Sequence, residues 1–300
     1  MVGRQITCSA DTKTSVYDPF AAAMAISAIG KSSYAAANVE RVYVELPSCG
    51  SVCPFCPEHE YLTPDEVQRV GVGAWQARAL PSKYAFDSGR HELVICSPNH
   101  NWSVHTSTVD ELAVALELYQ KRLEIISKDA PWVSSWLSYG LLAGQSQPHA
   151  HIQLLAFDTT PPNVAEELFH LQQSNCKLCG PSEDIIATYG RTSFTLTNPG
   201  AQVIIAPKEH TTWDTQEQST ALIWATKAMW ERCGSVPYNV VWHCGEFYQG
   251  HPHIHVLPRL FNPTATMALE GWTSSVGQWA DNANAWVQAL EHVASTKAVL

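Results

Sequence analysis

Two cysteines and the histidines that follow them are the residues of this chain best suited to metal chemistry. Cys53 and Cys56 form a C-x-x-C pair, His100 follows the tripeptide Ser-Pro-Asn, and residues 148–153 read Pro-His-Ala-His-Ile-Gln. Two thiolates on a tight turn and two imidazoles from separate strands complete a tetrahedral Zn²⁺ site with no open position for water. We therefore predict a structural zinc bound by Cys53, Cys56, His100 and His149. The alternative is a pair of buried free thiols beside unrelated histidines.

The same order of cysteines and histidines recurs in the second half of the chain, which argues against that alternative. Cys176 and Cys179 form another C-x-x-C pair, His210 comes next, and residues 251–255 read His-Pro-His-Ile-His. A repeat of this kind indicates two copies of one structural unit. A second zinc bound by these cysteines and His210 needs a fourth ligand, for which the candidates are His251, His253 and His255.

The segment that carries His149 is also predicted to carry a nucleophile. In a strand His149, His151 and Gln153 lie on one face, because side chains alternate between the two faces. A neutral imidazole of His151 can attack an α-phosphorus and form a phosphoramidate. Gln153 would then donate to a phosphoryl oxygen, and the loop Gly144-Gln145-Ser146 would hold the growing phosphate charge through its amides and hydroxyl. The alternative is that His151 is simply a further metal ligand.

The elements that position these residues follow from the hydrophobic pattern. An amphipathic helix is predicted from Val109 to Ile126, and the second half repeats it from about Glu217 to Arg232. A further helix is predicted to start at Thr63 and Pro64, and residues 267–300 read as mostly helical. Strands are predicted at 41–47, 75–80, 92–96, 132–142, 149–157, 194–197, 201–206, 238–242 and 253–257.

Composition excludes several classes of protein. The 300 residues are 45% hydrophobic and carry a net charge of −10 with no run of Lys or Arg, so a nucleic-acid partner is not expected. No apolar stretch reaches the length of a membrane span, and no signal-peptide pattern stands at Met1–Lys31. The nine cysteines are an odd number and four of them form C-x-x-C pairs, which is typical of reduced thiols and metal ligands. We expect a cytoplasmic protein without a membrane partner.

These motifs together resemble the galactose-1-phosphate uridylyltransferase family of the histidine-triad superfamily. The matching pieces, spread from Arg41 to Arg259, are Cys-Pro-Phe-Cys56, Ser-Pro-Asn-His100, Pro-Trp132, Gly-x-Ser146-x-Pro-His-x-His151-x-Gln153, Pro-Lys-x-His210, Trp-His243 and the final His-x-His. The resemblance implies an α+β fold of two fused histidine-triad-like half-barrels, an antiparallel sheet flanked by helices. The first repeat would span residues 1–165, the second residues 166–300, and the chain would form a homodimer.

The resemblance also implies roles for individual residues. His151 would be the nucleophile, Gln153 the phosphate donor and Ser146 a phosphate contact. One or two zinc ions would be bound by Cys53, Cys56, His100 and His149 and, in the second half, by Cys176, Cys179, His210 and His251. The predicted nucleotide- and phosphate-binding residues are Ser82, Lys83, Ser138, Gly144, Gln145 and Ser146. Ser82 and Ser138 stand where many members have Asn, and the Arg-x-Asp-Pro stretch of the family is not recognisable in Met1–Glu40.

The second half allows two registers. Comparison with simple histidine-triad proteins places His251 at the metal-ligand position and His253 in the middle, whereas direct overlay of the halves places His253 and His255 opposite His149 and His151. These histidines could form a second catalytic triad, or a degenerate half kept for metal binding and packing, which we favour. Glu167 and His243 could belong to another histidine–carboxylate metal site.

The predicted function is that of a nucleotidyltransferase, which moves a nucleoside monophosphate from a sugar nucleotide through His151 to a sugar 1-phosphate. One alternative is a sugar-nucleotide phosphorylase, which shares the covalent intermediate and uses inorganic phosphate as acceptor. Another, from a different class, is a non-catalytic, zinc-stapled nucleotide-binding protein.

Overall fold

The computed structural model describes residues 15–17, 43–45, 52–85, 90–140, 143–171, 176–179, 185–197, 202–211, 213–233, 237–245 and 247–258. The predicted C-terminal helix and Arg259 lie outside these ranges. A separate antiparallel ladder pairs β1 (Ser15–Tyr17) with β2 (Tyr43–Glu45), and the latter lies within the strand predicted at residues 41–47.

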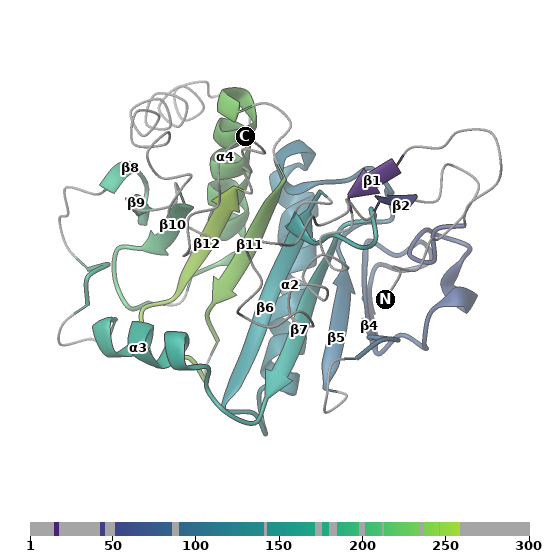
Figure 1. Cartoon of the computed structure of the whole chain (residues 1–300), viewed down its shortest axis with the longest axis horizontal. Helices are drawn as coiled ribbons and strands as arrows, with labels where there is room; N and C mark the ends of the chain where they lie inside the picture. The colour runs from purple at the N-terminus through teal and green to yellow at the C-terminus, as the bar shows by residue number, and fades with distance from the viewer. Residues whose placement is uncertain are drawn as a thin grey trace, which may run out of the picture.

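A ten-stranded antiparallel sheet forms the body of the molecule (Figure 1). In the first half its strands are β3 (Gln68–Val70), β4 (Ala77–Pro81), β5 (His91–Ile95), β6 (Trp132–Tyr139) and β7 (His151–Phe157). In the second half they are β8 (Ile185–Tyr189), β9 (Thr192–Thr197), β10 (Gln202–Pro207), β11 (Tyr238–His243) and β12 (His253–Pro258). The strand order β3-β4-β5-β7-β6-β11-β12-β10-β9-β8 reads the same way inward from either edge. The α+β fold of two fused repeats is therefore confirmed, and the repeats meet where β6 pairs with β11.

The alternation of side chains along the strands places the core residues on one face of the sheet and the predicted site residues on the other. Ile152 and Leu154 of β7 are fully buried in the core, as are Val240 of β11 and Val256 of β12. The residues between them in sequence lie on the opposite face, because side chains of a strand alternate. That opposite face carries His151 and Gln153 in the first half. It carries Asn239 with His243, and His253 with His255, in the second.

One long helix from each repeat covers the core face of the sheet. Helix α2 (Val109–Ile126) and helix α4 (Thr215–Cys233) pack against each other and against the strands (Figure 1). Thr108 and Glu111 form a capping box at the start of α2, and the Asp214 carboxylate accepts from the backbone N–H of Glu217 at the start of α4. Both helices were predicted to within two residues. No helix in the described part of the chain is long and apolar enough to span a membrane.

The prediction that a helix starts at Thr63 is wrong. The 3₁₀-helix η1 (Glu60–Leu62) ends there instead, and Thr63 has extended backbone angles. Its hydroxyl donates to the carbonyl of Glu60 at 2.8 Å and accepts from buried Arg78, so the side chain closes a turn instead of opening a helix. A short helix not predicted from sequence, α3 (Pro162–His170), contains the proposed boundary between residues 165 and 166, which stays a prediction.

A buried histidine joins the two repeats on the helix side and predicts a pH effect. His105, in η2 (Val104–Thr106), stacks on Trp230 at 3.9 Å between ring centroids and hydrogen-bonds the Tyr238 hydroxyl through Nδ1. Burial, with a smaller contribution from the charge of Lys227, lowers the pKa of His105 to about 4. As the pH falls from about 6.5 to about 4, His105 becomes protonated in the unfolded chain but stays neutral in the folded protein. The free energy of unfolding therefore decreases over this range.

His105→Phe should therefore flatten the dependence of unfolding free energy on pH over that window, by up to about 3 kcal/mol. Urea unfolding at pH 7, 6, 5 and 4.5 measures it. Ser107→Ala, at the buried C-terminal end of η2 and without a titrating group, is the control and should keep the wild-type slope. An unchanged slope in His105→Phe would contradict the assignment.

Candidate active site and metal centres

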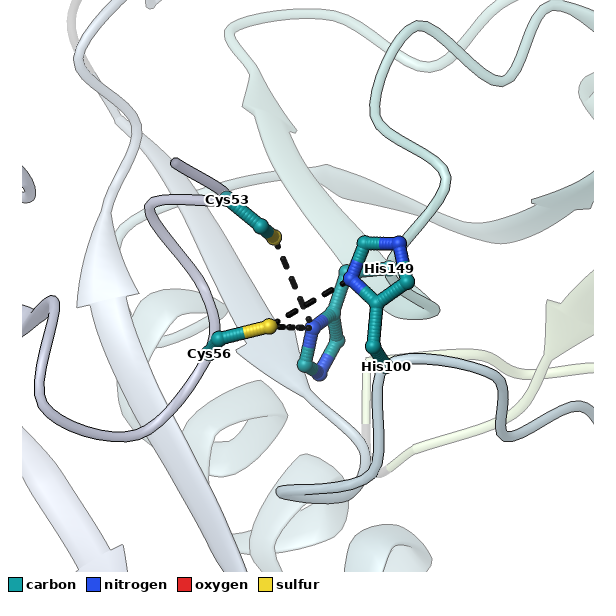
Figure 2. Close-up of side chains that lie close together, drawn as sticks. All are labelled: Cys53, Cys56, His100 and His149. Atoms are coloured by element: carbon teal, nitrogen blue, oxygen red, sulfur yellow. Dashed lines mark hydrogen bonds between the residues drawn. The ribbon is translucent and has the colours of Figure 1, made fainter. Parts of the chain in front are cut away.

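The first four predicted metal ligands converge in space (Figure 2). The donor atoms of Cys53, Cys56, His100 and His149 all lie within 4.8 Å of one another. The Cys56 sulfur is 3.3 Å from Nδ1 of His100 and 3.6 Å from Nδ1 of His149, which is also 3.7 Å from the Cys53 sulfur. Two sulfurs and two imidazole nitrogens are the donor set of a closed tetrahedral site. The cluster can hold a metal ion.

The protein around this cluster fixes the ligand orientation. Nε2 of fully buried His149 donates to the carbonyl of Ser97 at 2.6 Å, which leaves the lone pair of Nδ1 facing the sulfurs. Burial, and then the neighbouring Cys53, raises the pKa of Cys56 to about 11, so a bound metal must displace a thiol proton. Arg78, which is 1% exposed, donates to the carbonyl of Pro54 at 3.1 Å and thereby braces the turn between the two cysteines.

The second cluster reproduces the first in detail. The Cys176 and Cys179 sulfurs lie 3.3 and 3.4 Å from Nδ1 of His251, and His210 completes a group within the same 4.8 Å limit. Nε2 of His251 donates to the carbonyl of Pro207 at 2.6 Å, as His149 does to Ser97. Of the two registers, the structure has the one that places His251 beside the two cysteines and His253 at the position of His151.

A third cluster occupies the place in the second repeat that His151 and Gln153 occupy in the first. Glu167 of α3 meets His243, His253 and His255, with Oε1 2.7 Å from Nδ1 of His243. Nε2 of His253 is 2.8 Å from Nε2 of His255, and the Tyr248 hydroxyl donates to Glu167. Burial alone would raise the pKa of Glu167, but hydrogen bonds from the three histidines outweigh it and hold that pKa well below its usual range. This group too can hold a metal ion.

His151 lines a cavity of about 810 Å³ on the face of the sheet opposite the helices. Its Nδ1 donates to the carbonyl of His149 at 3.0 Å, which assigns the proton to Nδ1 and leaves a lone pair on Nε2. Burial lowers the pKa of His151, which favours the neutral ring. The Phe55 ring packs edge-on at 5.3 Å and limits ring rotation. This is the arrangement that a nitrogen nucleophile requires.

Most of the predicted nucleotide- and phosphate-binding residues line the same cavity. They are Ser82, Lys83, Ser138, Gly144 and Ser146, together with Gln153. Gly144 has φ +81°, a conformation that L side chains rarely adopt, and a Cβ there would meet no atom within 4 Å. Gln145 is not among the lining residues. Its side chain accepts from Gly140 N–H and donates to the Pro148 carbonyl, so it braces the loop.

Asn239 and His91 line this cavity and were not predicted as site residues from sequence. Asn239 of β11 donates to the Ser138 hydroxyl at 2.8 Å and to the Ala143 carbonyl at 2.9 Å, so the second repeat supports the glycine loop of the first. His91 of β5 hydrogen-bonds Gln153. Because side chains alternate along a strand, the predicted site residue His243 could have indicated that Asn239 lies on the same face. His91 was missed because the predicted strand began one residue later, at Glu92.

Comparison with known proteins places this geometry in context. No family model matches the sequence. ADP-glucose phosphorylase from Arabidopsis thaliana is 25% identical over an alignment of 197 residues, and the match covers 53% of this chain and 56% of that protein. The chain therefore matches little more than half the length of this curated relative.

Solved structures extend the match to most of the chain. The crystal structure of an Arabidopsis thaliana ADP-glucose phosphorylase with bound ADP-glucose superposes with a TM-score of 0.63 at 21% identity, covering 72% of this chain and 83% of that one. A uridylyltransferase structure gives a TM-score of 0.62 at 18% identity, with 81% and 91% covered. This chain has their fold. The predicted resemblance to the galactose-1-phosphate uridylyltransferase family is thereby confirmed as a likeness in fold.

Proposed function

We propose that this protein processes nucleotide sugars by transferring a nucleoside monophosphate through a covalent intermediate on His151. The observation that carries the proposal is the ring of His151, which lines the cavity with its Nδ1 proton held by the His149 carbonyl. The match to an ADP-glucose phosphorylase and the shared fold with a uridylyltransferase support the same class of substrate.

In the first step, Nε2 of His151 would form a bond to the α-phosphorus as the bond from that phosphorus to the leaving phosphate oxygen breaks. Sugar 1-phosphate departs with the bonding electrons. The ring then carries positive charge, and Nδ1–H, already directed at the His149 carbonyl, stabilises it. In the second step an acceptor phosphate oxygen attacks phosphorus, the P–N bond breaks, and the ring returns to its neutral form.

Other residues of the cavity would control the charge on phosphorus. The Gln153 amide, the Ser146 hydroxyl and Lys83 are the donors we assign to the phosphoryl oxygens. Donors fixed in place before the reaction stabilise developing charge without reorganisation. The two Cys₂His₂ clusters would hold zinc, which supplies structural cross-linking when bound. Their closed donor sets leave no position for substrate.

Two acceptors need to be compared. A sugar 1-phosphate would make the protein a nucleotidyltransferase, which is our first proposal. Inorganic phosphate would make it a phosphorylase, which the name of the curated relative favours. The covalent intermediate is the same for both. We further propose a homodimer and a cytoplasmic location.

A donor screen tests the proposal. The purified chain is incubated with UDP-, ADP- and GDP-glucose and with the galactose analogues, each labelled in the α-phosphate. We expect one donor to leave label on protein that is labile to acid and stable to base, as a phosphoramidate is. Release of that label by phosphate or by a panel of sugar 1-phosphates then identifies the acceptor. Saturable binding without label from any donor would overturn catalysis and favour a binding protein.

A further inference from the structure

His91 is a buried histidine of the cavity to which the proposed chemistry gives no part. It begins β5, is 3% exposed and lines the cavity that contains His151. Strand alternation puts it on the same face as Leu93, which pairs directly with Gln153 of β7. Nε2 of His91 lies 3.2 Å from Oε1 of Gln153. This hydrogen bond joins His91 to the residue assigned to the phosphoryl oxygens.

The chemistry of the Gln153 amide makes this contact significant. An amide has an accepting oxygen at one end and a donating NH₂ at the other, and a half turn about its last bond exchanges them. With the oxygen toward the phosphoryl group, the amide would repel the charge that it is meant to stabilise. Only one of the two orientations serves a phosphoryl transfer.

The surroundings of His91 favour that orientation. A proton on Nε2 can be donated only to the oxygen of Gln153, so the NH₂ group is turned to the other side. Trp136 lies directly across from Gln153 on β6, and its ring is stacked with His91 at 6.1 Å and 25° between planes. The histidine ring therefore contacts one residue from each of the next two strands of the sheet, Gln153 of β7 and Trp136 of β6.

We propose that His91 is a positioning residue that orients the Gln153 amide, with its NH₂ toward the phosphoryl group, through a proton on Nε2. The expected effect on the reaction rate rests on the proposed function, whereas the orientation of the Gln153 amide by His91 does not. His91 itself makes no bond to the substrate and transfers no proton.

The kinetic test is a double-mutant cycle on the rate of covalent labelling by the donor that the screen selects. His91→Leu should lower the rate constant about 10-fold and Gln153→Ala about 100-fold, as for the loss of a fixed donor to a developing oxyanion. The double variant should be no slower than Gln153→Ala alone, because His91 acts only through that amide. His91→Gln, which keeps an N–H donor near the position of Nε2, should restore most of the rate.

The matched control is Glu92→Gln, one residue along β5. Its side chain faces away from the cavity and makes two 2.7 Å contacts with Arg122 of α2. It should label at the wild-type rate, and melting temperatures check that each variant is folded. If His91→Leu slows labelling equally with and without Gln153, the positioning role is overturned and His91 acts independently.

A second readout does not need activity. In protein labelled with ¹⁵N-histidine, the signals lost in His91→Leu belong to His91, and their shifts report which ring nitrogen carries the proton. We expect the Nε2–H tautomer. The Nδ1–H tautomer would overturn the inference even if labelling proceeds normally. A protein that takes no label but shows Nε2–H would instead overturn the proposed function and leave the orientation of Gln153 standing.

Discussion

His151→Gly is expected to abolish covalent labelling by every nucleotide-sugar donor, with turnover reduced by at least about 10⁴-fold. The reason is that His151 combines a lone pair on Nε2 with a backbone carbonyl that accepts the Nδ1 proton, and the variant has no side-chain nitrogen at this position. Donor affinity should change little, because the residues assigned to binding are untouched. Label counted per chain, together with equilibrium binding of the unreacted donor, measures both effects.

His253→Gly is the matched control for this result. His253 occupies the same position in the second repeat, is 1% exposed, and donates from Nδ1 to the carbonyl of His251 at 2.8 Å. It lies against Glu167 and two histidines, away from the lining of the described cavity. We expect this variant to keep one label per chain. Label lost in His253→Gly and kept in His151→Gly would reverse the assignment of the two halves.

Cys53→Ser is expected to lower zinc content and thermal stability together. The four donors of its cluster come from a turn, from the segment after β5 and from the entry to β7, so a bound metal ties three segments far apart in sequence. Binding energy at such a site is coupled to folding. Loss of several kcal/mol should lower the melting temperature by about 10 °C in a chain of this size.

Cys96→Ala is the control, because Cys96 is buried in the core outside the three clusters. It should keep the zinc content of the wild type. Metal analysis and calorimetry of both variants, with Cys176→Ser as the counterpart in the second repeat, separate the two sites. Melting unchanged after zinc is lost would refute a structural role.

Much of the fold could be predicted because local signals and tertiary packing agree. The apolar spacing from Val109 to Ile126 gives the boundaries of α2, and the capping residues Thr108 and Glu111 reinforce its start. The repeated cysteine and histidine order correctly predicts which residues of the first Cys₂His₂ cluster come together and, in the second, that Cys176, Cys179 and His210 do. Spacing along the chain is informative here because each cluster lies within one repeat and the two clusters occupy equivalent points of two similar units.

Other features of the fold and the site depend on tertiary contacts that cannot be predicted from the sequence pattern. Thr63 and Pro64 look like the start of a helix, but buried Arg78 binds the threonine hydroxyl and stabilises an extended backbone. The register of the second-half histidines depends on where β12 begins relative to Pro207, which is a question of strand pairing. Asn239 and His91 can be recognised as residues of the cavity only once β11 is known to pair with β6, and β5 with β7.

The pairing of β6 with β11 has a consequence for how this duplicated architecture can be dissected. Although His151, the proposed nucleophile, and the neighbouring Cys₂His₂ cluster belong to one repeat, Asn239 and Val241 of the other repeat line the same cavity as His151. A fragment ending after β7 would expose the backbone of β6 as an unprotected, aggregation-prone edge and leave the glycine loop without its amide support. The second repeat can therefore change the residues of its own clusters more freely than those of β11. The residues of β11 pair with β6 and support the glycine loop of the first repeat.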